Sequence, residues 1–227
     1  MPSEHLPEWE RVLSAAAHLQ DVLPGAVLVG GTAAAVYAGH RISVDADHVI
    51  ADLKAKFDIV LFELESVAGW KTARIARPVM ILGSLDGIET GIRQLIRDAP
   101  LETRTVEVGG AKLTIPTEAE IFAHQGCTDL EAQRHAGLCG FRGVGRSYGR
   151  PATIEALRGL DELYPQPNDE SALLQLQIQL SMPLPFDLDD MGLAEYKNLV
   201  ARWHQWPDVR AACESLAILI FDKIIAA

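Results

Sequence analysis

The stretch LVGGTAAAVYAGHRISVDADHVI, residues 28–50, decides how this sequence is expected to fold. An apolar run ends in the pair Gly30 and Gly31, and an alanine-rich segment follows. The next apolar run carries two acidic residues, Asp45 and Asp47, one position apart. Aspartate is depleted in strands and is costly to bury without a partner. The stretch therefore predicts that a bound partner offsets the cost of these two carboxylates.

Two strands and an intervening helix account for this pattern. Residues 26–30 are typical of a short apolar strand that the glycines end, and Thr32 is predicted to cap the helix that follows. Residues 42–50 are predicted to form the second strand. Because side chains alternate along a strand, Asp45 and Asp47 are expected on the same face.

Two carboxylates on one strand face repel each other unless a cation lies between them. Mg²⁺ binds one or two carboxylates together with substrate phosphates, so we predict a Mg²⁺ or Mn²⁺ site at Asp45 and Asp47. Gly30 and Gly31 allow the backbone to approach a phosphate at a helix N-terminus, where the Thr32 hydroxyl adds a further group. Each of the two motifs has a plainer interpretation when taken alone, because Gly-Gly marks many tight turns and Asp-x-Asp also occurs in glycosyltransferases.

Composition narrows the class of protein. The 227 residues carry a net charge of −11, which argues against a broad nucleic-acid-binding surface but allows a local basic groove or a basic protein partner. Three cysteines, Cys127, Cys139 and Cys213, have no metal-binding spacing and are expected to be reduced thiols. No run approaches the ~18 apolar residues of a membrane span, and the N-terminus lacks a signal-peptide layout. We expect no membrane association and a cytoplasmic location.

Two hairpins are predicted in the rest of the first half, where Asp86-Gly87 and Gly109-Gly110 supply the residues that tight turns require. Amphipathic spacing predicts helices over residues 7–20 and 52–70. The strands expected beside the turns are PVMILGS (78–84), IETGIRQLIR (88–97) and the two arms of RTVEVGGAKLTIP (104–116). Residues 1–116 are therefore expected to form a mixed α/β domain.

The second half, residues 117–227, is predicted to be helical. Thr117 and Glu120 fit a capping box at its start. Prolines separate four further segments with helical spacing: TIEALRGLDELYP (153–165), NDESALLQLQIQL (168–180), LAEYKNLVARWHQW (193–206) and PDVRAACESLAILIFDKIIA (207–226). We expect this half to be a separate helical domain.

The order strand, Gly-Gly, helix, Asp-x-Asp resembles the nucleotidyltransferase superfamily. More closely, GGTAAAVYAGHRISVDADHV (30–49) is similar to the AbiEii/AbiGii toxin-type nucleotidyltransferases, which show Gly-Gly-Thr-Ala and then Arg-x-Ser-x-Asp-x-Asp. The likeness is clear over residues 26–50 and continues more weakly to about residue 121. It implies an α+β fold, with a nucleotidyltransferase-like mixed β-sheet, flanking helices and a helical C-terminal domain.

The resemblance also implies an activity. A metal-dependent nucleotidyltransferase moves a nucleoside monophosphate from a nucleoside triphosphate (NTP) to an acceptor hydroxyl, and metals clamp the reacting oxygens of such a displacement. Asp45 and Asp47 would hold the metal, while Gly30, Gly31 and Thr32 would hold the phosphates. The implied acceptor is RNA, with tRNA as one such RNA. The implied role is the toxin of a toxin–antitoxin pair, with an antitoxin protein as partner.

Further site residues are predicted beside this centre. Arg41 and Ser43 are expected to orient the triphosphate or the site loop. The resemblance implies a third carboxylate on a neighbouring strand, for which Glu89 is the candidate and Glu107 the alternative; it would help to deprotonate the acceptor. Asp86 is expected to be a turn residue. The plainer interpretation of either glutamate is an exposed strand residue.

Three polar residues near these positions have two interpretations each. Arg93 and Gln94 either line the same cleft or form surface contacts. His48 either supports the aspartates or is a buried structural histidine.

The likeness ends at Ile121. Family members continue with a basic stretch that contains Arg-Asp-x-x-Asp, whereas residues 122–152 hold six of the 18 glycines and show no helical or strand period. One interpretation is a glycine-rich loop that contacts RNA or phosphate. The other is a compensated pair of frameshifts, because codons allowed by residues 126–150, read one base later, can encode AALILKRNATRDYVDFAALADRMGD, an amphipathic helix. The coding DNA tests this hypothesis.

Two function classes follow from these interpretations. The first is an active nucleotidyltransferase. The second is a catalytically impaired nucleotide-binding or protein-interaction module with the same fold, expected if the glycine-rich interval replaces the cationic groups of the site. A glycosyltransferase is disfavoured because the first half, residues 1–116, is short for one.

Overall fold

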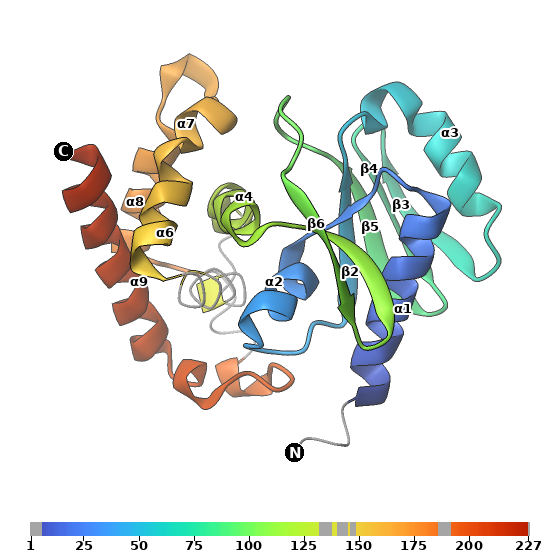
Figure 1. Ribbon diagram of the computed structural model, residues 1–227, viewed down its shortest axis with the longest axis horizontal. Helices are drawn as coiled ribbons and strands as arrows, with labels where there is room; N and C mark the ends of the chain where they lie inside the picture. Colours follow the sequence, from blue (N-terminus) through green and yellow to red (C-terminus); the bar gives the residue numbers. More distant parts are fainter. Residues whose placement is uncertain (1–5, 132–137, 140–144, 146–148, 186–191, 227) are drawn as a thin grey trace. The chain divides into compact units, whose positions relative to one another are not determined.

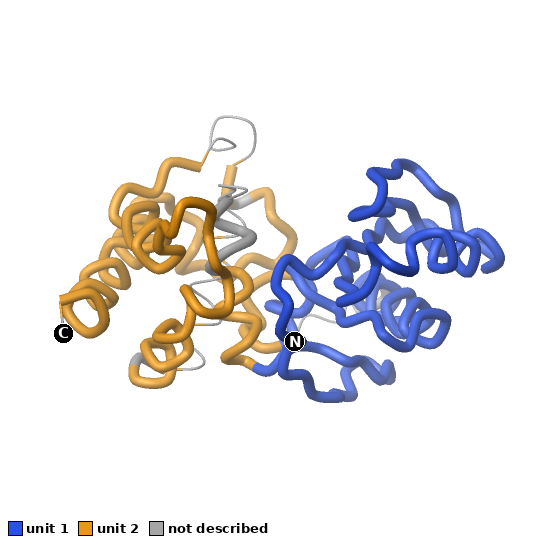
Figure 2. The backbone as a smooth tube through the Cα atoms, turned by 90° about the horizontal axis from the view of Figure 1, so that it is seen from above, with its two compact units in different colours: residues 1–36, 43–117 blue, residues 37–42, 118–227 orange. Residues whose placement is uncertain are grey.

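The computed structural model describes residues 6–131, 138–139, 145, 149–185 and 192–226. It contains two compact units, which Figure 2 shows in different colours. The first comprises residues 1–36 and 43–117, and the second comprises residues 37–42 and 118–227. The short segment 37–42 therefore belongs to the second unit, although its neighbours in the sequence belong to the first.

The first unit contains a five-stranded mixed sheet and a separate hairpin. The sheet has the strand order β1-β2-β5-β4-β3, in which β2 and β5 are parallel and the other pairs antiparallel. The elements of this unit are α1 (Leu6–Val22), β1 (Val27–Leu28), α2 (Gly30–Ala38), β2 (Asp45–Ile50), α3 (Leu53–Glu65), β3 (Trp70–Ala76), β4 (Met80–Leu85), β5 (Ile88–Gln94), β6 (Thr103–Val108) and β7 (Ala111–Pro116). Strands β6 and β7 pair only with each other. The mixed sheet with flanking helices confirms the fold class expected from the sequence.

The two faces of the five-stranded sheet differ in character. Helices α1 and α3 lie on the same side of it (Figure 1), and Ile50, Ile81, Leu85 and Ile92 share a buried core with them. Side-chain alternation places Asp45 and Asp47 on the opposite face. We call this the aspartate face; by strand register it contains Val27, Asp45, Asp47, Val49, Lys71, Arg74, Ala76, Met80, Leu82, Ser84, Glu89, Gly91 and Arg93.

Both predicted hairpin turns are confirmed. Asp86 and Gly87 have φ values of 53° and 82°, and Gly109 and Gly110 have 57° and 77°. Positive φ at both central residues is the backbone that two-residue hairpin turns prefer.

Two other predictions for this unit need correction. Helix α2 begins at Gly30, so Thr32 lies inside the helix and is not its cap. Strand β3 was not predicted: the helix expected over 52–70 ends at Glu65, and residues 70–76 form the edge strand.

The second unit is helical, as expected. Helix α4 packs against α6 and α8, and α8 packs against α9. Its elements are α4 (Glu118–Glu131), α6 (Arg150–Arg158), α7 (Leu160–Leu163), the 3₁₀ turns η1 (Pro167–Asp169), η2 (Leu193–Glu195) and η3 (Ala201–Trp203), α8 (Ala172–Ser181), α9 (Trp206–Ile220) and the π-helical turn η4 (Phe221–Ile225). No helix in the described ranges is long and apolar enough to cross a membrane.

Two predictions for this unit are wrong in part. The helix expected over 193–206 is replaced by two 3₁₀ turns, because backbone groups there bond elsewhere: Ile42 N–H donates to the Lys197 carbonyl (2.9 Å) and Val200 N–H to the His40 carbonyl (2.9 Å). Helix α4 runs on to Glu131, so residues 122–131 are helical and not aperiodic. Most of the remaining glycine-rich interval lies outside the described residues.

Candidate functional site

The Asp47 carboxylate lies against two glycines. A Cβ on Gly91, its register partner on β5, would lie 2.7 Å from Asp47 Oδ1 and 2.8 Å from Leu82 Cδ2. Such contacts would require the Asp47 and Leu82 side chains to move, so the carboxylate in its observed position occupies space that Gly91 leaves. Gly30, at the start of α2 with φ +65°, borders the same carboxylate, since its Cβ would lie 3.7 Å from Oδ2. The helix start and the Asp47 carboxylate are therefore immediate neighbours.

Hydroxyl groups fix the position of Asp45. The Ser43 hydroxyl is buried and donates to Asp45 Oδ1 at 2.6 Å. The buried Thr32 hydroxyl donates to the Asp45 main-chain carbonyl, which ties α2 to the start of β2. A hydrogen bond from a neutral hydroxyl to a carboxylate is charge-assisted and directional. Ser43 and Thr32 therefore hold the first aspartate in place, and the phosphate contact predicted for Thr32 stays a prediction.

The electrostatics of the pair suit a cation. Burial, and after it the negative charge of Asp45, raise the pKa of Asp47 to about 6, while the Arg93 guanidinium partly opposes both effects. A cation between the carboxylates would remove the repulsion and favour the ionised form. Carboxylate oxygens are ligands that Mg²⁺ and Mn²⁺ prefer, so Asp45 and Asp47 fit such an ion in charge and chemistry.

Two solved structures resemble this chain over nearly its whole length. A protein from H. pylori, provisionally described as a nucleotidyltransferase, aligns with a TM-score of 0.57 and 17% identity over 99% of this chain and 98% of its own. JHP933 from Helicobacter pylori aligns with a TM-score of 0.56 and 17% identity over 99% and 95% of the two chains. The fold is nucleotidyltransferase-like. A scan of protein-family models and a search of curated proteins find no match.

On this nucleotidyltransferase-like fold, Glu89 lies next to the aspartates in register. It pairs with Asp45 across the parallel strands β2 and β5, and its side chain is exposed. Within the part of the chain that the structure describes, no three His, Cys, Asp or Glu residues gather closely enough for a metal site. Glu89 is thus placed beside the pair but not joined to it, and its catalytic role stays a prediction.

The other two acidic candidates lie elsewhere. Glu107 is on β6, in the separate hairpin, opposite Lys112. Asp86 is the first central residue of a hairpin turn, and its carboxylate lies 3.9 Å from His18 Nδ1. The turn interpretation of Asp86 therefore agrees with the structure, and Glu89 is the candidate that shares the aspartate face.

Arg41 belongs to the second unit. Its guanidinium lies 5.9 Å from the centre of the Tyr196 ring, and Nη1 lies 3.4 Å from the Ile42 carbonyl oxygen. The cation–π contact holds the side chain against the second unit. The triphosphate contact predicted for Arg41 stays a prediction.

The remaining polar candidates are resolved by their contacts. His48 is fully buried on the helix-covered face, its Nδ1 lies 3.0 Å from the Ala46 carbonyl oxygen, and burial lowers its pKa to about 4. Gln94 accepts from Lys54 N–H (2.8 Å) and donates to the Ala51 carbonyl (2.6 Å), so it fastens the start of α3. Both are structural. Arg93 shares the aspartate face and is exposed, and its Nη1 donates to Met80 Sδ at 3.0 Å; a role for it in the site stays a prediction.

Sequence reasoning missed two features of this face. Gly91 was not singled out, although a glycine inside a strand signals the close approach of another group. Lys71 and Arg74 were missed together with β3, even though Thr72 and Ile75 are β-branched residues that favour strands. Gly91 lies on β5, and Lys71 and Arg74 lie on the edge strand β3, where pairing register determines which residues share a face.

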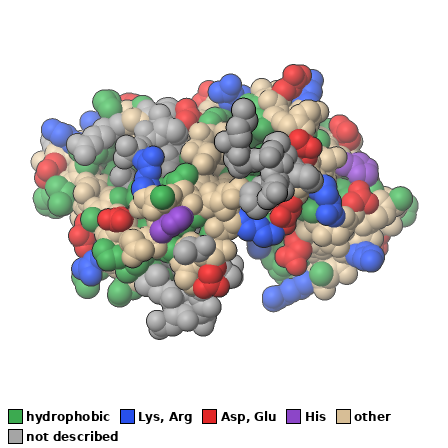
Figure 3. Space-filling view, turned by 90° about the horizontal axis from the view of Figure 1, so that it is seen from below, with side chains coloured by type: hydrophobic (Ala, Val, Ile, Leu, Met, Phe, Trp, Pro, Cys, Tyr) green, Lys and Arg blue, Asp and Glu red, His purple; other side chains and the backbone are tan. Residues whose placement is uncertain are grey.

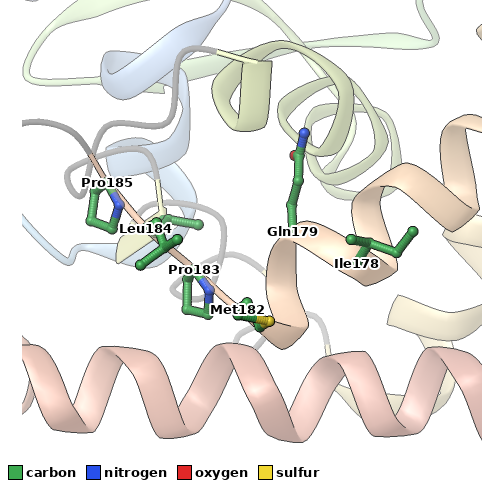
Figure 4. A pocket seen from close by; sticks show the side chains of 7 residues that line it. Ile178, Gln179, Met182, Pro183, Leu184 and Pro185 are labelled. Carbon is green, nitrogen blue, oxygen red and sulfur yellow. The ribbon is translucent and has the colours of Figure 1, made fainter.

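The second unit has an apolar cavity at the end of α8. Ile178 and Gln179 line it from the helix, and Met182, Pro183, Leu184 and Pro185 line it from the segment that follows (Figure 4). Leu138 completes the lining. Because no lining residue is ionisable, this cavity offers no acid–base chemistry, and the aspartate face is the candidate site.

Proposed function

We propose that this protein is a metal-dependent nucleotidyltransferase that moves a nucleoside monophosphate from an NTP to an acceptor hydroxyl. One observation carries the proposal: Asp45 and Asp47 share a strand face directly beside the glycine start of α2, and Gly91 leaves the space that the second carboxylate occupies. A carboxylate pair next to a helix N-terminus combines a place for a divalent cation with a place for phosphate.

The reaction assigns a role to each group. The acceptor oxygen bonds to the α-phosphorus, the bond from that phosphorus to the oxygen bridging to the β-phosphate breaks, and pyrophosphate leaves. The hydroxyl proton passes to a carboxylate, for which Glu89 is proposed. The backbone at Gly30, Gly31 and Thr32 holds the β- and γ-phosphates. Mg²⁺ or Mn²⁺ bound by Asp45 and Asp47 would supply charge stabilisation of the reacting oxygens.

Ser43 has a positioning role in this scheme. Its 2.6 Å hydrogen bond fixes the rotamer of Asp45, so that the carboxylate does not have to be ordered when the metal and nucleotide bind. Catalytic groups that are fixed beforehand avoid reorganisation during the reaction. Arg41 is proposed to contact the triphosphate.

Transfer itself is tested with each α-phosphate-labelled NTP, Mg²⁺ and total RNA. We expect label to move to RNA with the wild type and with Asp21→Asn, an exposed acid of α1 that serves as the matched control. The double variant Asp45→Asn/Asp47→Asn should be inactive while it stays folded. Absence of metal-dependent transfer by the wild-type protein refutes the proposal. Nucleotide binding without transfer would then favour the alternative, an impaired nucleotide-binding or protein-interaction module.

The acceptor and the biological role are finer proposals. The likeness of residues 26–50 to toxin-type nucleotidyltransferases supports RNA as the acceptor and a toxin role opposed by an antitoxin protein. Induced expression of the wild type is then expected to stop growth of host cells, whereas the double variant at Asp45 and Asp47 should not. Equal growth with both proteins would refute the toxin role and leave the transferase proposal standing.

A further inference from the structure

Two cations extend the aspartate face to the edge of the sheet. Strand register continues across four strands from each aspartate. The first row contains Asp45, Glu89, Ser84 and Lys71, and the second contains Asp47, Gly91, Leu82 and Arg74. Lys71 and Arg74 are both exposed. The first row therefore runs from the carboxylates of Asp45 and Glu89 across Ser84 to Lys71, and the second row runs from Asp47 across two neutral residues to Arg74.

A β-bulge brings the two cations to the same face. Lys71 and Arg74 are three positions apart, so regular alternation would point them to opposite faces. The register shifts between Thr72 and Arg74, which leaves Ala73 as an extra residue. Thr72 confirms the orientation, because its hydroxyl accepts from Trp70 Nε1 (2.9 Å) and donates to Glu65 of α3 (3.3 Å) on the helix-covered side. Bulges next to functional sites commonly redirect a side chain in this way.

The position of the cations relative to the aspartates suggests what they bind. Strands β2 and β3 are three strand spacings apart, which is about 14 Å. At the opposite end of the second row, Gly30 at the start of α2 borders Asp47. Strands β1 and β2 lie at this end of the sheet. If pyrophosphate leaves towards α2, in-line displacement requires the acceptor to approach from the side of β5, β4 and β3. This step rests on the proposed function.

We propose that Lys71 and Arg74 form an acceptor-side subsite for the phosphodiester backbone of a single nucleic-acid strand. The strand's terminal hydroxyl would lie at the aspartates and its preceding phosphates at β3. A small cationic acceptor would be repelled by these side chains, and a small neutral one would not span the distance. On the face shown in Figure 3, acidic and basic side chains are intermingled, so among the described side chains there the protein presents no continuous basic surface. With a net charge of −11, binding should depend on such local cations.

Strand binding is tested by fluorescence anisotropy with labelled single-stranded RNA and single-stranded DNA of the same sequence, in EDTA and without NTP. The variant is Lys71→Gln/Arg74→Gln. The matched control is Arg104→Gln/Lys112→Gln, which removes two exposed cations from the β6–β7 hairpin and changes the net charge equally. We expect the β3 variant to lose about tenfold in affinity at low salt and the control to lose little.

The salt dependence of strand affinity gives an independent measure of how many phosphates the protein contacts. Two lost phosphate contacts reduce the log–log salt slope by about 1.4, so between roughly 50 and 200 mM salt the wild type should weaken about sevenfold more than the β3 variant. Equal affinities or equal slopes for the β3 variant and the control would overturn the subsite. Self-association of the β3 variant with unchanged strand binding would also overturn it, because the cations would then serve to protect the sheet edge.

The assay separates this inference from the proposed function. Without NTP it reports strand binding whether or not transfer occurs, so intact strand binding with no transfer would refute only the transferase. Where transfer is observed, the β3 variant should raise KM for the acceptor strand and leave KM for the NTP unchanged. The strand that binds more tightly identifies the acceptor as RNA or DNA.

Discussion

Replacing Asp47 with asparagine should stabilise the metal-free protein at neutral pH. Burial and the charge of Asp45 raise the pKa of Asp47 from 3.8 to about 6. The folded state therefore favours the protonated carboxyl relative to the unfolded chain. A rise of about two pKa units corresponds to about 3 kcal/mol of folding free energy once the group is ionised. Asparagine keeps the shape of the side chain and removes this cost.

The sign of the pH dependence follows from linkage. Because the folded pKa is raised, the wild type has its full relative stability below pH 3.8 and loses it as the pH rises through about 6. Asp47→Asn does not titrate, so its advantage should be absent in acid and greatest at neutral pH. Partial solvent access to the carboxylate reduces the expected gain to about 1–3 kcal/mol, or roughly 2–4 °C of Tm for each kcal/mol.

The assay is thermal or urea unfolding in EDTA across this pH range, with Asp21→Asn as the control for an exposed acid. Added Mg²⁺ should then stabilise the wild type and not Asp47→Asn, because the cation needs both carboxylates. A variant no more stable than the wild type at neutral pH, or a stability gap that persists in acid, would refute the electrostatic argument.

Two further substitutions test the packing and the hydrogen bonding around the two aspartates. Gly91→Ala places a Cβ 2.7 Å from Asp47 Oδ1. We expect the free energy of unfolding to fall by about 1–3 kcal/mol and the affinity for Mg²⁺ to fall as well. An unchanged affinity in calorimetric titration would contradict the packing argument. Ser43→Ala removes the 2.6 Å hydrogen bond to Asp45, and Mg²⁺ affinity or transfer rate should fall about 10- to 100-fold, whereas Ser43→Thr should retain part of it.

Local sequence signals were sufficient to predict much of the structure of the first unit. The hairpin turns at Asp86-Gly87 and Gly109-Gly110 depend on residues that accept positive φ, and this requirement is visible in the sequence. The shared face of Asp45 and Asp47 follows from strand alternation alone. The helix expected over 193–206 failed because its backbone groups bond to residues 40–42, a long-range pairing that local periodicity does not encode.

The rest of the site could not be predicted from the sequence because it depends on how the strands pair. That Gly91 lies opposite Asp47 depends on β2 and β5 being parallel and in one particular register. The shared face of Lys71 and Arg74 depends on a bulge, and three-residue spacing in the sequence suggests the opposite arrangement. The sequence could therefore identify the aspartates together with Gly30 and Ser43, but not Gly91 or the two cations of β3.

The aspartates alone do not decide between an active transferase and an impaired module. The space around the Asp47 carboxylate is created by the absence of a side chain at Gly91, with Gly30 bordering the other oxygen. A chain that kept Asp45 and Asp47 but carried alanine at position 91 would keep the fold and the motif while displacing the carboxylate. This chain has both glycines and the buried Ser43 hydroxyl that orients Asp45. The arrangement that the proposed transferase needs therefore depends on Gly30, Gly91 and Ser43 as well as on the two aspartates, and alanine at position 91 is the substitution that separates the motif from the site.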